Sequence, residues 1–200
     1  LDGAGGQVDY QYNAFGERTV ETTTLLGNTT RVDNYDYDGR GLLTDSYIDK
    51  LGDNAHVERA YDAFGRVISV IDANGNETRT TYVDNSGQVV TTFANQSSET
   101  ITYDVFARQV VVNDRAGNTS TYRYDDENRT TLIVNAKQQG TELTYNTHGE
   151  LTDVIKGTVT DNTDGEVPVQ EITAENKLEH THFTYDKNGN QFTQTIGYGT

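Results

Sequence analysis

The sequence contains no cysteine, no methionine and no tryptophan, and only one of its 200 residues is a proline. Without cysteine the chain forms no disulfide, offers no thiol nucleophile and supplies no cysteine-ligated zinc site. Only 33% of the residues are hydrophobic, and no apolar run approaches the about 20 residues that a membrane-spanning helix needs. No signal peptide is recognisable. Because the chain begins at Leu1, we expect it to be a piece of a longer protein.

Basic residues are also scarce. The chain has 15 Lys and Arg against 31 Asp and Glu, which gives a formal net charge of −16. Such a charge disfavours binding to nucleic acid and to anionic membrane surfaces. The acidic residues are spread over turns and strand ends, so we interpret them as a source of solubility. We expect no nucleic-acid partner and no membrane insertion.

Tyrosine is abundant and periodic. It returns every 21 residues at Tyr61, Tyr82, Tyr103, Tyr124 and Tyr145, with looser copies at Tyr12, Tyr37 and Tyr185. Most of these tyrosines are followed by Asp or Asn and then, at the fifth position of the motif, by a glycine: Gly16, Gly41, Gly65, Gly149 and Gly189. Asn128 and Ala107 occupy that position in two copies, and we expect strain at Ala107. A fixed period of this length indicates a repeat architecture.

The residues before each motif tyrosine alternate between apolar and polar, which is the pattern of a half-buried strand. The Asp or Asn and the glycine after it are typical of a turn. A second turn is predicted within the repeats, at 74–76, 95–97, 116–118 and 139–140. The sequence therefore predicts an all-β fold of tandem antiparallel β-hairpins, one per repeat of about 21 residues. An open sheet of so many strands must curl, so we expect a curved or spiralling single layer in which the tyrosines are mostly buried.

The repeats are not equally regular. We expect one array over residues 1–200, with a regular core at 61–145. The interval from Tyr145 to Tyr185 is close to two repeats. Within it, 156–178 contains the single proline, Pro168, and is predicted to be an irregular hairpin or a long loop.

The segment YDAFGRVISVIDANGNETRTTY at 61–82 resembles the YD repeat of the Rhs family, whose pattern is Tyr-Asp-x-x-Gly-Arg-Leu/Val followed by a second turn with Gly-Asn. Similar repeats occur in bacterial Rhs polymorphic toxins, in the B and C subunits of Tc-type toxins, in wall-associated bacterial proteins and in teneurins. The lack of cysteine and tryptophan favours the bacterial members over teneurins.

The resemblance implies a hairpin sheet wound into a hollow shell. It implies as partners the remainder of that shell and an encapsulated C-terminal toxin domain, in a secreted or cell-surface bacterial protein. The Asp-Pro cleavage segment of Rhs toxin cores is absent, because Pro168 follows Val167.

Signals of chemistry are weak. No nucleophile elbow or P-loop is present. His180 and His182 lie on one face of a predicted strand, but no third metal ligand can be identified, so we favour two surface histidines. Asp161, Asp164 and Glu166 do not match a calcium loop and are interpreted as turn carboxylates. We therefore predict no cofactor, no metal site, no catalytic residue and no enzymatic activity.

Two functions remain open. The first is a structural segment of an encapsulating β-shell. The alternative is a carbohydrate-binding or adhesive cell-surface module, in which aromatic residues such as Tyr47 or Tyr198 contact glycans. Because raw sheet edges favour pairing between chains, we also expect edge-to-edge self-association.

Overall fold

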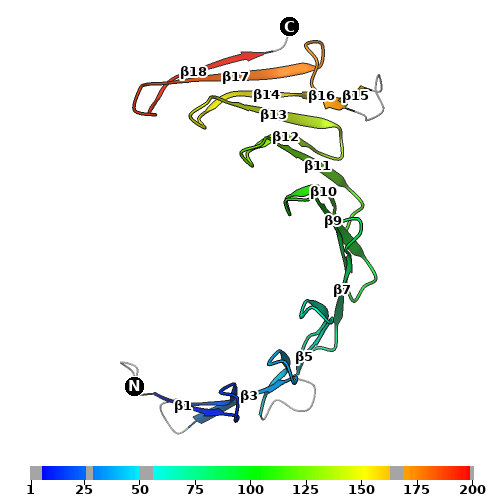
Figure 1. Cartoon of the computed structure of the whole chain (residues 1–200), viewed down its shortest axis with the longest axis vertical. Coiled ribbons are helices and arrows are strands. Elements are labelled where there is room, and N and C mark those ends of the chain that lie inside the picture. The colour runs from blue at the N-terminus through cyan, green and yellow to red at the C-terminus, as the bar shows by residue number, and fades with distance from the viewer. Residues whose placement is uncertain (1–5, 26–28, 50–55, 163–168, 199–200) are drawn as a thin grey trace. The chain divides into compact units, whose positions relative to one another are not determined.

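The computed structural model describes residues 6–25, 29–49, 56–162 and 169–198. Every regular element in these ranges is a β-strand (Figure 1). None of the described residues forms a helix with the length and hydropathy of a membrane span. Asp164, Glu166 and Pro168 lie outside the described residues.

The first eight strands are β1 (Gln7–Tyr12), β2 (Arg18–Leu25), β3 (Thr29–Tyr37), β4 (Leu43–Ile48), β5 (Val57–Tyr61), β6 (Val67–Ile71), β7 (Glu77–Val83) and β8 (Gln88–Thr92). The other ten are β9 (Ser98–Tyr103), β10 (Gln109–Asn113), β11 (Thr119–Tyr124), β12 (Thr130–Val134), β13 (Gln139–Tyr145), β14 (Leu151–Thr158), β15 (Thr160–Asn162), β16 (Val169–Glu171), β17 (Lys177–Tyr185) and β18 (Gln191–Tyr198).

The strand order follows the chain. A 16-stranded sheet runs from β1 to β14 and continues with β17 and β18, while β15 and β16 form a separate two-stranded sheet. The strand pairs are antiparallel, as in β1–β2, β5–β6, β13–β14 and β17–β18. The predicted all-β array of antiparallel hairpins is confirmed.

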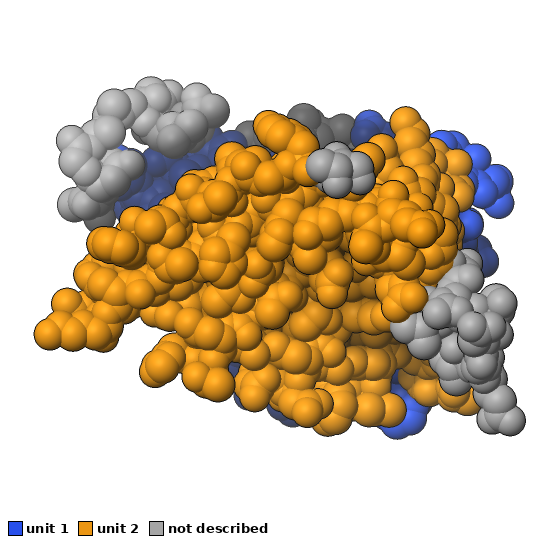
Figure 2. All heavy atoms as spheres, turned by 90° about the horizontal axis from the view of Figure 1, so that it is seen from above, with its two compact units in different colours: residues 1–82, 89–98 blue, residues 83–88, 99–200 orange. Residues whose placement is uncertain are grey.

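The chain divides into two compact units, coloured separately in Figure 2. The first comprises Leu1–Tyr82 and Val89–Ser98, and the second comprises Val83–Gln88 and Glu99–Thr200. Within each unit the long strands form one curved layer (Figure 1). A single layer has little interior, and this limits how far any side chain can be buried.

The hairpins are closed by turns of one kind, which the turn after β5 illustrates. The carbonyl of Asp62 accepts a hydrogen bond from the Gly65 amide at 3.1 Å, and the Asp62 amide donates to the Arg66 carbonyl at 3.0 Å. Gly65 has a φ of 81°, which glycine adopts without steric cost. The pairing register shifts between Ala60 and Tyr61. Together these features describe a type I turn followed by a bulge.

The same turn closes both ends of the hairpins. Its left-handed position is occupied by Gly16, Gly41, Gly65, Gly75, Gly117, Gly149 and Gly189 and by the non-glycine residues Gln96, Ala107, Asn128 and Gln138.

One predicted turn lies at a different position from the one expected. The turn expected at 139–140 has its positive φ of 58° at Gln138, and Gly140 lies within β13.

Gly140 is needed for packing rather than for a turn. A side chain at Gly140 would collide with Val159, and one at Gly157 would meet Ile172 at 2.5 Å. Val159 and Ile172, which lie between β14 and β17 in the chain, thus pack directly on the sheet, where they cover Leu132 and Val134. Here the C-terminal unit has its most buried apolar residues, with Val134 only 2% exposed.

The strain at Ala107 gives a test of the turn. Its φ is 62°, and a left-handed conformation costs a non-glycine residue about 1–2 kcal/mol. We expect Ala107→Gly to stabilise the protein by up to about 1 kcal/mol, after the larger unfolded-state entropy of glycine is subtracted. Chemical denaturation measures the difference.

Ala116→Gly is the matched control, because Ala116 lies in an equivalent turn one position before the left-handed Gly117. It is expected to lower the stability by about 0.5 kcal/mol. Equal effects of the two substitutions would show that strain at Ala107 is absent.

Candidate functional site

The recurring chemical feature of the chain is an Asp-capped turn after the motif tyrosine. Oδ1 of Asp62 accepts hydrogen bonds from the amides of Phe64 at 2.8 Å and Arg66 at 2.9 Å. Asp104 and Asp125 cap their turns in the same way. The second oxygen of each carboxylate receives the Nε–H of the arginine that ends the turn, at 2.7 Å in all three copies. One aspartate therefore fixes both the backbone and the arginine.

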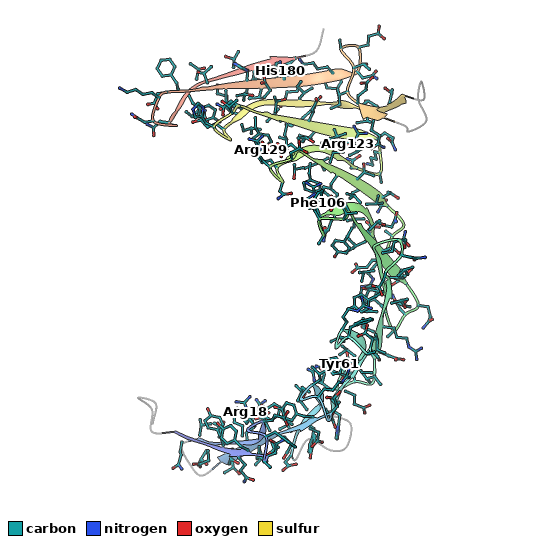
Figure 3. The ribbon with its side chains drawn as sticks, in the orientation of Figure 1. Arg18, Tyr61, Phe106, Arg123, Arg129 and His180 are labelled. Carbon is teal, nitrogen blue, oxygen red and sulfur yellow. The ribbon has the colours of Figure 1, made fainter. Side chains whose placement is uncertain are left out.

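The arginine then reaches the next repeat. The guanidinium of Arg66 lies 4.1 Å from the ring centroid of Tyr82, and those of Arg108 and Arg129 lie 4.8 Å and 4.7 Å from the rings of Tyr124 and Tyr145. These distances fit cation–π contacts. Figure 3 labels Arg129, whose side chain lies beside its ribbon in the C-terminal unit.

The hydroxyl of the motif tyrosine also forms a hydrogen bond with the preceding repeat. It donates to the carbonyl of the residue that begins the strand after the preceding motif turn. The bonds are Tyr37 to Arg18 at 2.9 Å, Tyr61 to Leu43 at 2.7 Å, Tyr82 to Val67 at 3.2 Å, Tyr124 to Gln109 at 2.9 Å, Tyr145 to Thr130 at 3.1 Å and Tyr185 to Leu151 at 2.7 Å. We call these contacts, from aspartate through arginine to the next tyrosine and from its hydroxyl back to the preceding repeat, the Asp–Arg–Tyr ladder. The complete set is formed by the turns at Asp62, Asp104 and Asp125, and Tyr37, Tyr61 and Tyr185 contribute the hydroxyl bond.

The motif tyrosines are largely covered, although none is fully buried. Tyr37, Tyr61, Tyr82, Tyr103, Tyr124, Tyr145 and Tyr185 are all partly buried, with most of their surface covered, whereas Tyr12, on the edge strand β1, is 60% exposed. The prediction of mostly buried rings therefore fails at Tyr12, whose strand has a neighbour on one side only in the described sheet. The turn after Tyr82 has one residue more than the other motif turns described above, because its glycine is Gly87 at the sixth position. The Gly87 carbonyl accepts a hydrogen bond from the Tyr103 amide at 2.8 Å.

A complementarity within the turn was missed in the sequence. Where the first residue is Asn13 or Asn146, the fifth is Glu17 or Glu150, and the asparagine amide donates to that carboxylate. In three turns that begin with aspartate the fifth residue is an asparagine, in the pairs Asp72–Asn76, Asp114–Asn118 and Asp186–Asn190. The turn at Asp38 is an exception, because its fifth residue is Leu42 and its carboxylate pairs with Arg40 instead. The first residue supplies the acceptor for a donor at the fifth, or the reverse. Comparing the two positions across the repeats would have revealed this pairing.

The turn carboxylates are stabilised as anions. The largest influence on Asp104 is burial, which raises its pKa, but hydrogen bonds from the Arg108 backbone and side chain outweigh it and lower the pKa overall. Hydrogen bonds from Asn76 lower the pKa of Asp72. Because folding lowers the pKa of these carboxyl groups, the contacts stabilise the folded state fully at a pH above the ordinary pKa. The contribution is lost as the pH falls through the lowered pKa.

The two histidines at the C-terminal end have a partner that the sequence did not reveal. Nε2 of His180 and Nδ1 of His182 lie 2.7 Å and 2.8 Å from the same oxygen, Oδ1 of Asp153. Among the described residues, this is the cluster whose ligand atoms approach closely enough to hold a metal ion, all within 4.8 Å of one another. The third ligand thus comes from the neighbouring strand β14, 27 residues away from His180 in the sequence.

Exposed aromatic rings are also found at the tips of the motif turns, where the sequence did not suggest them. Phe15, Phe64 and Phe106 are 89%, 81% and 72% exposed, and Figure 3 labels Phe106 at its turn. Tyr198 is exposed as expected, whereas Tyr47 is half-buried and stacks on His56 with centroids 4.6 Å apart.

The pairing within the turn can be tested by exchange. Arg108→Glu places a second carboxylate beside Asp104 and removes the contact with Tyr124. We expect the melting temperature to fall by roughly 2–4 °C. Adding Asp104→Asn recreates the pair seen at Asn146 and Glu150 and should recover part of the loss. The contacts of Arg108 with the Tyr124 ring, the Asp125 carbonyl and the Asn128 side chain stay missing.

Circular dichroism melts measure the three proteins, and Lys187→Glu controls for the change in charge, because Lys187 is an exposed residue of an equivalent turn. A double variant no more stable than Arg108→Glu would contradict the pairing.

Comparison with known proteins agrees with the hairpin unit. Residues 61–98 match the family model described as RHS Repeat. No curated protein sequence matches the chain significantly. Among solved structures, TcdB2-TccC3 without its hypervariable C-terminal region is 15% identical over 98% of this chain and 14% of its own length, with a TM-score of 0.44. A Tc holotoxin pore of Photorhabdus luminescens is 13% identical over 96% of this chain and 14% of its own, with a TM-score of 0.45.

The chain spans about a seventh of the length of these structures, as the coverage of 14% states. The family match covers 61–98, a little less than two of the 21-residue repeats. The same tyrosine, capped turn and second turn recur before it and after it. Residues 61–98 therefore match an RHS repeat, and hairpins of the same kind flank them in the described sheet.

Proposed function

We propose that this chain is a structural segment in the wall of an encapsulating β-shell of a secreted bacterial toxin-type protein. The observation that carries the proposal is the Asp–Arg–Tyr ladder. The aspartate fixes the arginine within one turn, and the arginine–tyrosine and tyrosine–carbonyl contacts join one hairpin to the next. The arrangement therefore extends by adding repeats and converges on no single pocket. The wall of a shell needs such contacts between neighbouring hairpins.

The ladder also occupies the groups that catalysis would use. In the motif turns the aspartate oxygens accept backbone amides and the arginine, as at Asp104. The tyrosine hydroxyls donate to carbonyls, as Tyr124 does to Gln109. Carboxylates with depressed pKa values are poor general acids at neutral pH. These features support a structural role and no catalytic activity.

The partners follow from the same proposal. They are the remainder of the parent shell and a C-terminal toxin domain enclosed by it, in a protein that is secreted or held at the cell surface. We also propose that residues 1–200 act as one array, in which Tyr12 to Tyr185 and the turn glycines are the structural motif. The bond from Tyr185 to Leu151 supports this, because it resumes the ladder after the interruption at 156–178.

Encapsulation is tested in the parent-length protein. Limited proteolysis should leave the segment C-terminal to the shell uncut in the natural protein. It should be cut at least about tenfold faster after Arg108→Glu, because a weakened ladder opens the wall more often. Lys187→Glu is the control and should not change the rate. Equal, rapid cutting in all three proteins would contradict enclosure.

The alternative function is a carbohydrate-binding or adhesive surface, and the exposed phenylalanines at the turn tips are the observation that favours it. Aromatic rings on a polar surface can stack on sugars. A glycan array with the chain and with Phe64→Ala and Tyr198→Ala variants distinguishes the two functions. The shell proposal expects no binding, and binding that either variant abolishes would support the alternative instead.

The sheet edges are the surfaces through which a wall would continue. All residues of β1 and of β18 are exposed, and in the described sheet these strands stand at the two ends of the strand order. Unpaired edges favour pairing with further strands, whereas mutual repulsion from a charge of −16 opposes it.

We therefore expect the isolated chain to self-associate edge to edge, more strongly as salt screens the charge. Sedimentation velocity between low salt and about 0.5 M salt, where the screening length is only a few ångströms, measures this. Substituting Thr193 and Thr195 by proline should remove pairing through the β18 edge and so weaken the association. A monomer at every salt concentration would contradict it.

A further inference from the structure

The cluster of Asp153, His180 and His182 has no role in the Asp–Arg–Tyr ladder. Strand β17 carries His180 and His182 two residues apart, so both side chains leave the same face of the sheet. Asp153 lies directly opposite His182 in the pairing of β14 with β17. Residues opposite one another in an antiparallel pair share a face, and this register places the carboxylate between the two rings.

The distances between the ligand atoms are close to those of a metal site. Both ring nitrogens lie within 2.8 Å of one carboxylate oxygen. Around a zinc ion with bonds of about 2.1 Å, ligand atoms stand about 3.4 Å apart. The two contacts therefore need to lengthen by about 0.6–0.7 Å, which a small side-chain rotation supplies. The separation within the cluster never exceeds 4.8 Å.

The donor set selects the class of metal. Two imidazoles and one carboxylate suit Zn²⁺ and neighbouring first-row divalent ions, whereas Mg²⁺ and Ca²⁺ prefer all-oxygen sites. We propose that Asp153, His180 and His182 bind one Zn²⁺-type ion across strands β14 and β17.

The surroundings leave room for the ion and for water ligands. The side chains of His180, Asp153 and His182 are 34%, 23% and 48% exposed. Gly197 pairs with His180 on the other side, in β18. A methyl group placed on Gly197 would meet no atom closer than 4.0 Å. The site is therefore reachable from solvent, with an open coordination position in the sense of a three-ligand zinc site.

A bound ion would stabilise a specific part of the fold. The ligands are 27 and 29 residues apart in the sequence, and the chain between them contains the segment that packs on Gly140 and Gly157. Joining β14 to β17 through a metal closes this loop and favours the folded state over the unfolded one. This segment interrupts the regular repeats, and the metal links the strands on either side of it.

Isothermal titration of the full chain with zinc chloride tests the site. We expect one ion per chain. His180→Asn and Asp153→Asn should each weaken binding by more than about tenfold, because each leaves two ligands. His56→Asn is the matched control, since His56 also contacts a carboxylate, Asp45, at 2.7 Å but in a cluster without a second histidine. It should bind zinc as the natural chain does. Magnesium chloride should give no saturable heat.

A second measurement separates binding from misfolding. Zinc should raise the melting temperature of the natural chain and of His56→Asn by a few degrees and leave His180→Asn unchanged. His182→Gln serves as a further variant if His180→Asn does not fold, as judged by its circular dichroism spectrum. Equal zinc affinity in the natural chain and in folded cluster variants would overturn the proposal, as would loss of binding in His56→Asn.

Discussion

The constraint on which this structure depends is that its sheet has one layer. Apolar burial, which is the main stabilising term in most domains, is limited where no second layer covers the strands. Outside the covered region around Val134, the strands are mostly half-buried. Cohesion between hairpins must therefore come from backbone ladders and from polar side chains that reach from one repeat to the next.

The Asp–Arg–Tyr ladder meets this need with few residue types. A carboxylate that already caps a turn also orients the arginine, and a guanidinium held in this way loses little further freedom when it stacks on the next tyrosine. The tyrosine hydroxyl then satisfies a carbonyl at the start of a strand. Because each contact is local to two neighbouring hairpins, one copy can change without altering the rest. The Asn–Glu turns at Asn13 and Asn146 are examples.

The interruption between β14 and β17 is where the C-terminal unit departs from repetition. It supplies a second layer over Leu132 and Val134, and its flanking strands bring Asp153 to the two histidines. The ladder nevertheless resumes at Tyr185, whose hydroxyl reaches Leu151. An insertion that leaves the register of its neighbours intact can add a feature to a repeat protein without breaking the array.

The sequence by itself determined the local structure. Period-two alternation, the motif tyrosines and the turn residues specify strands, turns and their spacing, because those preferences act over a few residues. The left-handed positions at Gly65, Asn128 and Ala107 could be read in this way. The tertiary structure alone decided how exposed the tyrosines are, why Gly140 must be small, and that Asp153 faces His180 and His182. These features depend on strand register and on contacts between residues far apart in the chain, which no local pattern encodes.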